Sequence, residues 1–249
     1  MSLERLPQFL LSMKHDSRLL VKLEERQNQN SLRKLEIPEG LIDFCSNDYL
    51  GFAQSKELSD KIDQFDVSEL GNLIGSGASR LISANNSLAE KIEAKVSQLV
   101  DSETALLFNS GYNSNLGFFS CVPQRGDAVF YDEFAHASIR DGIKMGLAKS
   151  YSFKHNSLSD LEQRISVVKP EGSVFIAVES VYSMDGDSPN LVELANFCDE
   201  NGYNLVVDEA HAFGLFGDHG EGLIHELGIQ DKVYARIITF GKALGCHGA

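Results

Sequence analysis

Lys242 combines the residue type and the position that covalent chemistry would need. It follows the nearly continuous apolar run 236–240 and lies beside Gly241. A partly buried amine has a lowered pKa and becomes a nucleophile toward aldehydes. The alternative is an ordinary surface lysine in a flexible loop. The segment is not a phosphate-binding P-loop, because Arg236 occupies a position that this motif reserves for glycine.

Acid and imidazole side chains follow a second buried run, 205–207. The sequence there is Asp208-Glu209-Ala210-His211. A charged group at the end of a buried strand is costly unless a partner satisfies it. An aspartate in this position can hold a protonated ring nitrogen, and His211 can donate to a ligand oxygen. A solvated loop with one structural aspartate explains the same residues equally well.

Three more polar turns follow candidate strands. Ser110, Gly111 and Tyr112 open an apolar helix, and the free N–H groups of a helix start favour anions. His136 offers a planar ring that can stack on an aromatic ligand. The turn 179–187 gathers acids, hydroxyls and a glycine, as a polar ligand requires. The alternatives are an ordinary strand-to-helix turn, a structural histidine and a plain acidic loop.

These turns together indicate a site for pyridoxal 5'-phosphate (PLP). Such a site needs a lysine for the cofactor aldehyde, a carboxylate at the pyridinium nitrogen and a helix start at the phosphate. None of the turns is decisive singly. The cysteines Cys45, Cys121, Cys198 and Cys246 show no metal-ligand spacing, and no metal site is expected.

The elements that must position these turns alternate between strand and helix. Strands are predicted at 105–108, 127–131, 150–153, 174–178, 205–207 and 236–240. Three of these (VFIAV, LVV and RIITF) are nearly continuous apolar runs, which are typical of strands buried on both faces of a parallel sheet. The pattern predicts an α/β fold, in which ligands bind beyond the carboxyl ends of the strands.

Helices are predicted from apolar periodicity and from capping residues. An amphipathic helix is expected over 3–27, followed by a polar connector over 28–40. Ser87 and Glu90 predict a capping box at the start of a further helix, which begins near residue 87. Ser157 is expected to cap a helix that ends before Pro170, and Gly202 to close a helix that begins near residue 191.

Composition excludes several classes of protein. The 249 residues carry 22 Lys and Arg against 36 Asp and Glu, a net charge of −14, which argues against a duplex-binding protein. An apolar content of 43% argues against a disordered chain. No run approaches the roughly 20 apolar residues of a membrane span. No secretory signal is visible, and the scattered cysteines favour a reduced, cytoplasmic compartment.

The motifs taken in order resemble the α-oxoamine synthases, a family of fold-type I PLP enzymes. The matching segments are 47–51 (NDYLG), 75–81 (GSGASRL), 110–112 (SGY), 136–138 (HAS), 183–187 (SMDGD), 208–211 (DEAH) and 239–242 (TFGK). The resemblance runs from about residue 41 to the end. Ala84 and Ala89 depart from the family pattern, which makes the choice of acyl chain less defined.

The resemblance implies a type I PLP-dependent transferase fold, with a mostly parallel, seven-stranded-type sheet covered by helices. It divides the chain into an N-terminal helix and connector (1–40) and a PLP-binding large domain (41–249). The family's small C-terminal domain, which usually carries an arginine for the amino-acid carboxylate, lies outside this sequence. The resemblance also implies a homodimer, with no nucleic acid and no membrane as partners.

The resemblance assigns roles to residues of this chain. Lys242 holds the cofactor and later acts as the base at Cα, Asp208 pairs with the pyridine nitrogen, and His136 stacks on the ring. His211 and Ser183 lie near the phenolic oxygen. The phosphate contacts come from Ser110, Gly111, Tyr112 and Thr239, and the substrate entrance from Asn47, Ser76 and Arg80.

The reaction that the resemblance implies is a decarboxylative condensation of an amino acid with an acyl thioester. L-Alanine and pimeloyl-CoA or a pimeloyl carrier protein are the expected substrates, and 8-amino-7-oxononanoate, an intermediate of biotin synthesis, is the expected product. The alternatives are another reaction of the family, with glycine and acetyl-CoA, glycine and succinyl-CoA, or serine and a long acyl-CoA. A non-catalytic PLP-binding fragment or paralogue is a further alternative, because the C-terminal domain is missing.

Overall fold

The computed structural model describes residues 17–33, 35, 40–66, 68 and 75–249. The chain divides into two compact units, Met1–Cys45 and Ser46–Ala249. The first contains helix α2 (Ser17–Asn28), which covers the later part of the helix expected over 3–27. Residues 3–16 of that expected helix lie outside the described residues. The domain boundary predicted at residue 40 remains a prediction.

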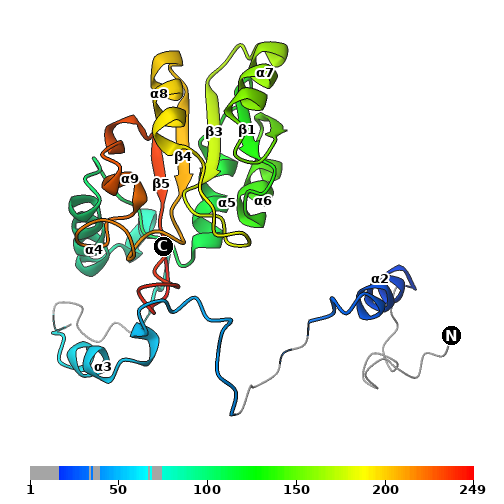
Figure 1. Cartoon of the computed structure of the whole chain (residues 1–249). Coiled ribbons are helices and arrows are strands. Elements are labelled where there is room, and N and C mark those ends of the chain that lie inside the picture. The colour runs from blue at the N-terminus through cyan, green and yellow to red at the C-terminus, as the bar shows by residue number, and fades with distance from the viewer. Residues whose placement is uncertain (1–16, 34, 36–39, 67, 69–74) are drawn as a thin grey trace. The chain divides into compact units, whose positions relative to one another are not determined.

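A parallel β-sheet forms the centre of the second unit (Figure 1). Its five strands are β1 (Ala128–Asp132), β2 (Lys149–Phe153), β3 (Val174–Glu179), β4 (Asn204–Asp208) and β5 (Ala235–Ile237), in the order β2-β1-β3-β4-β5. The register pairs Glu179 with Asp208 and Asp208 with Ile237. The carboxyl ends of three adjacent strands are therefore level. The expected α/β fold with a parallel sheet is confirmed, with five strands in the described residues.

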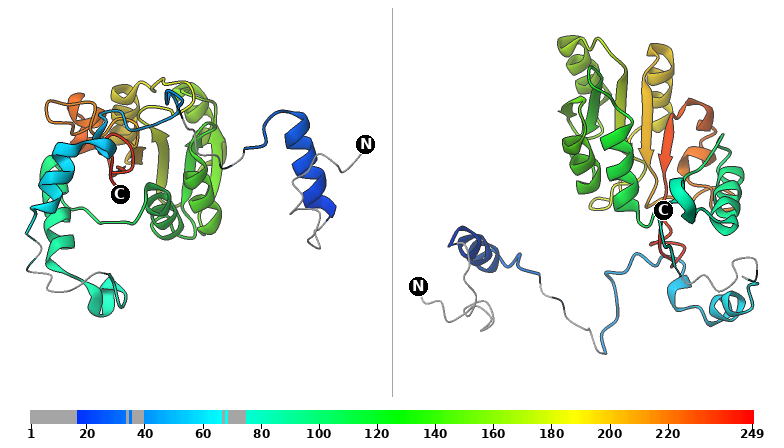
Figure 2. Two further views of the ribbon diagram at one scale, coloured as in Figure 1. Left: turned by 90° about the horizontal axis from the view of Figure 1, so that it is seen from below. Right: turned by 180° about the vertical axis from the view of Figure 1, so that it is seen from behind.

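Helices cover both faces of this sheet, because side chains along a strand point alternately to opposite faces. On one face, Phe130, Ile176 and Leu205 pack with helices α7 (Leu158–Val168) and α8 (Leu191–Asn201). On the other face, Phe175 and Val206 pack with helices α5 (Gly111–Cys121) and α6 (Ala137–Met145). Figure 2 shows the same arrangement from below and from behind. Both faces of the sheet are buried under helices, which explains the continuous apolar runs.

The remaining elements are short turns and helices outside the sheet. They are the 3-10 turns η2 (Phe52–Gln54) and η5 (Gln230–Lys232), the π-turn η4 (Arg80–Ala84), and the helices α3 (Lys56–Asp63), α4 (Ser87–Leu99) and α9 (Leu223–Glu226). Among the described residues, no helix has both the length and the apolar character that crossing a membrane requires.

Two of the three predicted helix boundaries are confirmed. The Ser157 hydroxyl accepts from the Asp160 N–H at the start of α7, and Gly202 ends α8 with a φ of 67°. The capping box at Ser87 is wrong. The cap of α4 is Asn86, whose side chain accepts from the Ala89 N–H at 2.9 Å. Asparagine and serine cap helices about equally well, so the sequence did not separate the two positions.

The prediction of a strand at 105–108 is also wrong. The segment forms no strand, and its backbone link is the pair of hydrogen bonds that Phe108 exchanges with Ala249, at 2.7 and 2.9 Å. The predicted strand 236–240 stops at Ile237. Beyond that residue the chain bonds to its own continuation, since the Phe240 N–H donates to the Gly248 carbonyl at 2.9 Å. A strand requires a neighbouring ladder, which local sequence does not reveal.

His155 ties together the loops that follow β1, β2 and β3. Its Nδ1 lies 2.9 Å from the buried carboxylate of Asp132, and its Nε2 lies 2.9 Å from the carboxylate of Asp187. The ring stacks on Phe134 at 4.4 Å. Both nitrogens face carboxylates, so the ring is an imidazolium that donates from each. The loops that it joins lead to the predicted site residues His136 and Ser183.

The charge of His155 makes this connection depend on pH. Burial lowers the pKa of His155, but the hydrogen bonds to Asp132 and Asp187 outweigh burial and raise the pKa above its usual value. A raised folded-state pKa contributes stability that is fully present below the unfolded pKa. That stability is lost as the pH rises through the folded pKa.

We predict that His155→Gln lowers the free energy of unfolding by about 2–3 kcal/mol at pH 6, because the buried Asp132 loses its charged donor. At pH 9 the difference between the two proteins is expected to be smaller, because the wild-type ring loses its charge as the pH rises through its folded pKa. Urea unfolding at both pH values measures this. The control is His219→Gln, which changes an exposed histidine. An equal loss at pH 6 and pH 9 would contradict an imidazolium at residue 155.

Candidate active site

Asp208 is a buried carboxylate at the carboxyl end of β4, with only 6% of its surface exposed. Its Oδ2 accepts from Asn115 Nδ2 at 2.7 Å, and its Oδ1 accepts from the Ala210 N–H at 2.9 Å. Within the described residues it forms no ion pair. The two donors hold the carboxylate in place and leave its charge uncompensated, which suits a cationic ligand group.

Asn115 also fixes the orientation of His136, the residue that precedes α6. The Asn115 Nδ2 donates to Ser138 Oγ at 3.1 Å, and Ser138 Oγ lies 2.7 Å from His136 Nδ1. The Ser138 N–H also points at this nitrogen, at 3.2 Å. Nδ1 is therefore an acceptor, and the ring proton is on Nε2. Burial lowers the pKa of His136 further, so the ring is neutral at pH 7.

Lys242 lies at one end of a second hydrogen-bonded chain. Its Nζ is 2.6 Å from His211 Nε2, and His211 Nδ1 is 2.7 Å from the hydroxyl of Tyr49. Burial lowers the pKa of Lys242, against the opposing charges of Asp208 and Glu179. Burial and the charge of Lys242 lower the pKa of His211 to about 4. A neutral imidazole therefore separates the amine from the tyrosine at neutral pH.

Glu179 places a second carboxyl beside Asp208, at the end of β3. Its Oε1 accepts from the backbone N–H of His136 at 2.7 Å. Burial, together with the charge of Asp208, raises the pKa of Glu179 to about 8. At neutral pH Glu179 is therefore mostly protonated, and the two carboxyls share one negative charge.

The turn that opens α5 lies against the segment that leads to Lys242. The Ser110 hydroxyl caps the helix by accepting from the Asn113 N–H at 3.1 Å. A Cβ on Gly111 would come within 3.2 Å of Thr239 Cβ, so these two positions touch. The Tyr112 ring packs edge-on against His136, with centroids 6.2 Å apart, and the Tyr112 hydroxyl donates to Asp141. The predicted phosphate residues thus lie beside the predicted stacking histidine.

The remaining predicted residues are less closely connected. Asn47 accepts from the Tyr49 hydroxyl at 3.2 Å and so joins the chain that leads to Lys242. Ser183 is exposed and makes no side-chain hydrogen bond to the described part of the chain. Ser76 donates to the Ala78 carbonyl, and Arg80 forms a two-pronged ion pair with Glu93. The substrate roles of Ser76 and Arg80 remain predictions.

Sequence reasoning missed four residues of this site: Tyr49, Asn115, Ser138 and Glu179. Tyr49 and Ser138 lie inside the motifs NDYLG and HAS, and Glu179 opens the acidic turn, but none of them has an individual signal. Asn115 lies four residues after Gly111, one helical turn further along the same side of α5. The helix also carries Asn113, Ser114 and Ser120, so the spacing alone did not single out Asn115.

Glu209 has a structural role rather than a chemical one. It is fully buried and pairs with Arg236, whose Nε donates to Glu209 Oε2 at 2.6 Å. Arg236 also donates to the Val100 carbonyl at 2.8 Å, and the Ile224 N–H donates to Glu209 Oε1 at 2.9 Å. This ion pair connects β5 with the turn after β4, the two segments that carry Lys242 and His211.

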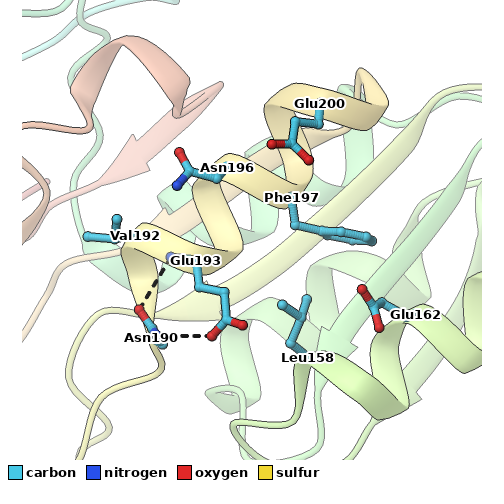
Figure 3. A pocket seen from close by; sticks show the side chains of 8 residues that line it. All are labelled: Leu158, Glu162, Asn190, Val192, Glu193, Asn196, Phe197 and Glu200. Carbon is cyan, nitrogen blue, oxygen red and sulfur yellow. Dashed lines mark hydrogen bonds between the residues drawn. The ribbon is translucent and has the colours of Figure 1, made fainter.

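A surface hollow of about 420 Å³ lies elsewhere, between α7 and α8 (Figure 3). It is lined by apolar and acidic side chains: Leu158, Glu162, Asn190, Val192, Glu193, Asn196, Phe197 and Glu200. The predicted site residues do not line it. The chemistry is therefore at the strand ends, where the side chains converge, and not in this hollow.

Comparison with known proteins decides the family. The family model described as aminotransferase class I and II matches residues 39–249. The chain belongs to this family. It is 40% identical over 243 residues to an 8-amino-7-oxononanoate synthase of Emericella nidulans, covering 91% of this chain and 59% of that protein.

Solved structures of this aminotransferase family share the fold. An 8-amino-7-oxononanoate synthase from Francisella tularensis is 29% identical, with a TM-score of 0.67, and the match covers 85% of this chain and 58% of that one. A structure of SPT with PLP as an internal aldimine is 25% identical, with a TM-score of 0.80, covering 93% and 61%. The chain spans about three fifths of the length of these relatives.

We predict that Asn115→Ala lowers the free energy of unfolding by about 2–3 kcal/mol at pH 7, because Asp208 stays buried with one donor fewer. The matched control is Ser114→Ala, which removes a neighbouring buried hydroxyl that bonds only to the Gly111 carbonyl. Urea unfolding of both variants measures the difference. Equal losses in the two variants would show that Asn115 does not stabilise the charge of Asp208.

Proposed function

We propose that this chain is the cofactor-binding part of a PLP-dependent α-oxoamine synthase. One observation carries the proposal: a partly buried lysine amine and a buried aspartate without an ion-pair partner lie at the same edge of the sheet. That pairing suits PLP, because the lysine amine can bind the aldehyde of the cofactor and the aspartate can bind its protonated ring nitrogen. The related SPT structure that contains PLP supports the same cofactor here.

The residues present fit this cofactor. Lys242 would hold it covalently through its aldehyde, and Asp208 would hold the pyridinium nitrogen. The neutral ring of His136 would stack on the pyridine. The phosphate would lie on the start of α5, where the N-terminal N–H groups face a turn of small residues. The contacts proposed there come from Ser110, Gly111, Tyr112 and Thr239, with His211 and Ser183 near the phenolic oxygen.

Asn115 carries a buried polar atom that has no partner among the described residues. Its Oδ1 is buried without a hydrogen bond from the described residues, while its Nδ2 is used twice. This oxygen belongs to the side chain that donates to Asp208, so a buried acceptor without a partner among the described residues lies close to the carboxylate. Such an acceptor is available to a polar N–H of a bound group.

The side chains of this site can move the proton that the reaction requires. When bound, the cofactor supplies an electron sink for the charge left at the amino-acid Cα. Lys242 has a lowered pKa, so a free amine is available to accept the Cα proton. Asp208 is held by two donors at the position where a carboxylate would stabilise a cationic ring nitrogen. Glu179 is mostly protonated at neutral pH and does not compete with Asp208.

We propose L-alanine and a pimeloyl thioester as the substrates of the full-length protein, with 8-amino-7-oxononanoate as the product. The named relatives in Emericella nidulans and Francisella tularensis support this choice. The acyl donor would be CoA or a carrier protein. Serine with a long acyl-CoA is a second candidate, favoured by the similarity to a serine palmitoyltransferase of Sphingomonas wittichii. We also propose a cytoplasmic homodimer, with Asn47, Ser76 and Arg80 at the substrate entrance.

The full-length protein, loaded with PLP, is expected to release free thiol from a pimeloyl thioester in the presence of L-alanine. Acetyl-CoA with glycine, succinyl-CoA with glycine and palmitoyl-CoA with serine should give at least tenfold less, because each changes the size that the acyl pocket must accept. Thiol release and mass spectrometry of the amino-ketone measure this. Lys242→Ala should abolish turnover, and Lys149→Ala, at the opposite edge of the sheet, should not.

Preference for another pair would reassign the protein within the α-oxoamine synthases. Cofactor binding without turnover on any thioester would favour a non-catalytic paralogue. Turnover by the 249-residue chain itself would exclude the fragment hypothesis.

A further inference from the structure

Tyr49 connects the amine of Lys242 to the protein surface. The two residues are joined through His211, which lies 162 residues from Tyr49 in the sequence and contacts both. Lys242 and His211 are partly buried, whereas 44% of the Tyr49 surface is exposed. The chain of three polar groups therefore runs from the interior of the site to solvent.

The direction of the hydrogen bonds follows from the chemistry of each group. A charged lysine only donates, so His211 Nε2 must accept from it, and the ring proton is then on Nδ1. That proton points at the Tyr49 oxygen, 2.7 Å away. Tyr49 in turn donates to Asn47 Oδ1 at 3.2 Å. Each link of the chain thus has one donor and one acceptor when Lys242 carries its proton.

The links between Lys242, His211 and Tyr49 also form when Lys242 is neutral, and the Tyr49 proton then turns from Asn47 to His211. The amine then has a lone pair that accepts from Nε2–H, and Nδ1 becomes an acceptor. A hydroxyl can donate as well as accept, so Tyr49 suits either tautomer of His211. A phenyl ring would suit neither.

We propose that Tyr49 is a positioning residue that passes a proton between Lys242 and solvent through His211. The inference rests on the proposed role of Lys242 as the base at Cα. In the outward step the Nζ–H bond breaks as the Nε2–H bond forms, and the Nδ1–H bond breaks as a new bond to the Tyr49 oxygen forms. The original Tyr49 proton passes to water. Lysine, histidine and tyrosine all end neutral, and one proton has left.

The surroundings favour transfer through a ring that never accumulates charge. Lys242 faces the carboxyls of Asp208 and Glu179, and His211 faces Lys242 and His136. Those neighbours disfavour a cationic His211, so arrival and departure of the proton must be coupled. Each turnover needs Lys242 to return to its starting protonation state, and the half-exposed Tyr49 gives a route from Lys242 to water.

The test compares Tyr49→Phe with Tyr234→Phe, a control in an exposed tyrosine away from the site. In the chain without cofactor, nitrogen-15 NMR of His211 measures exchange of the Nδ1 proton with water. We expect exchange to be about tenfold slower in Tyr49→Phe and unchanged in the control. In the PLP-loaded full-length protein, exchange of the alanine Cα hydrogen with deuterium oxide should slow similarly.

Buffer rescue separates a relay from simple packing. Added imidazole should restore both exchange rates of Tyr49→Phe in proportion to its concentration and leave the wild type unchanged. Wild-type exchange rates in Tyr49→Phe, or slow rates that imidazole does not restore, would overturn the proposal. Failure to bind PLP would instead count against the proposed function, and the measurement without cofactor would still decide the role of Tyr49.

Discussion

The site is organised around a negative charge that the protein buries but does not neutralise. Asp208 lies at the end of β4, bonded to one side-chain amide and one backbone N–H, and it forms no ion pair with the described residues. Burying a carboxylate costs free energy unless hydrogen bonds or an opposite charge stabilise it. The neighbouring groups supply the hydrogen bonds. Asn115 donates to Asp208 and, through Ser138, orients His136.

The sheet determines which groups share this charge. Because β3, β4 and β5 are parallel and in register, Glu179 and Ile237 flank Asp208 on the two adjacent strands. Burial and the charge of Asp208 raise the pKa of Glu179 to about 8, so Glu179 is mostly protonated at neutral pH. The chain that follows β5 places Lys242 near the carboxyl ends of the strands, within hydrogen-bonding distance of His211. The topology of the sheet thus places Asp208, a mostly protonated Glu179 and Lys242, whose pKa is lowered, close together.

The sequence predicted the parts that depend on local pattern. The continuous apolar runs of β3 and β4 gave the sheet, and the polar residues after them gave Asp208 and His211. The prediction of a strand at 105–108 was wrong because this apolar segment has no neighbouring strand with which to form a ladder of hydrogen bonds. Contacts between segments far apart in the sequence could not be predicted either. No residue near Tyr49 in the sequence indicates its hydrogen bond to His211, and none near Glu209 indicates its ion pair with Arg236.

The central claim is that one lysine at this edge of the sheet holds PLP. Borohydride reduction of PLP-treated protein, followed by peptide mass mapping, tests it most directly, because reduction makes the bond between lysine and cofactor permanent. We expect one modified peptide, containing Lys242, and its absence from Asp208→Ala at limiting PLP, because the ring would lose its ionic partner. Label distributed over surface lysines, with Lys242 unmodified, would show that Lys242 does not hold the cofactor.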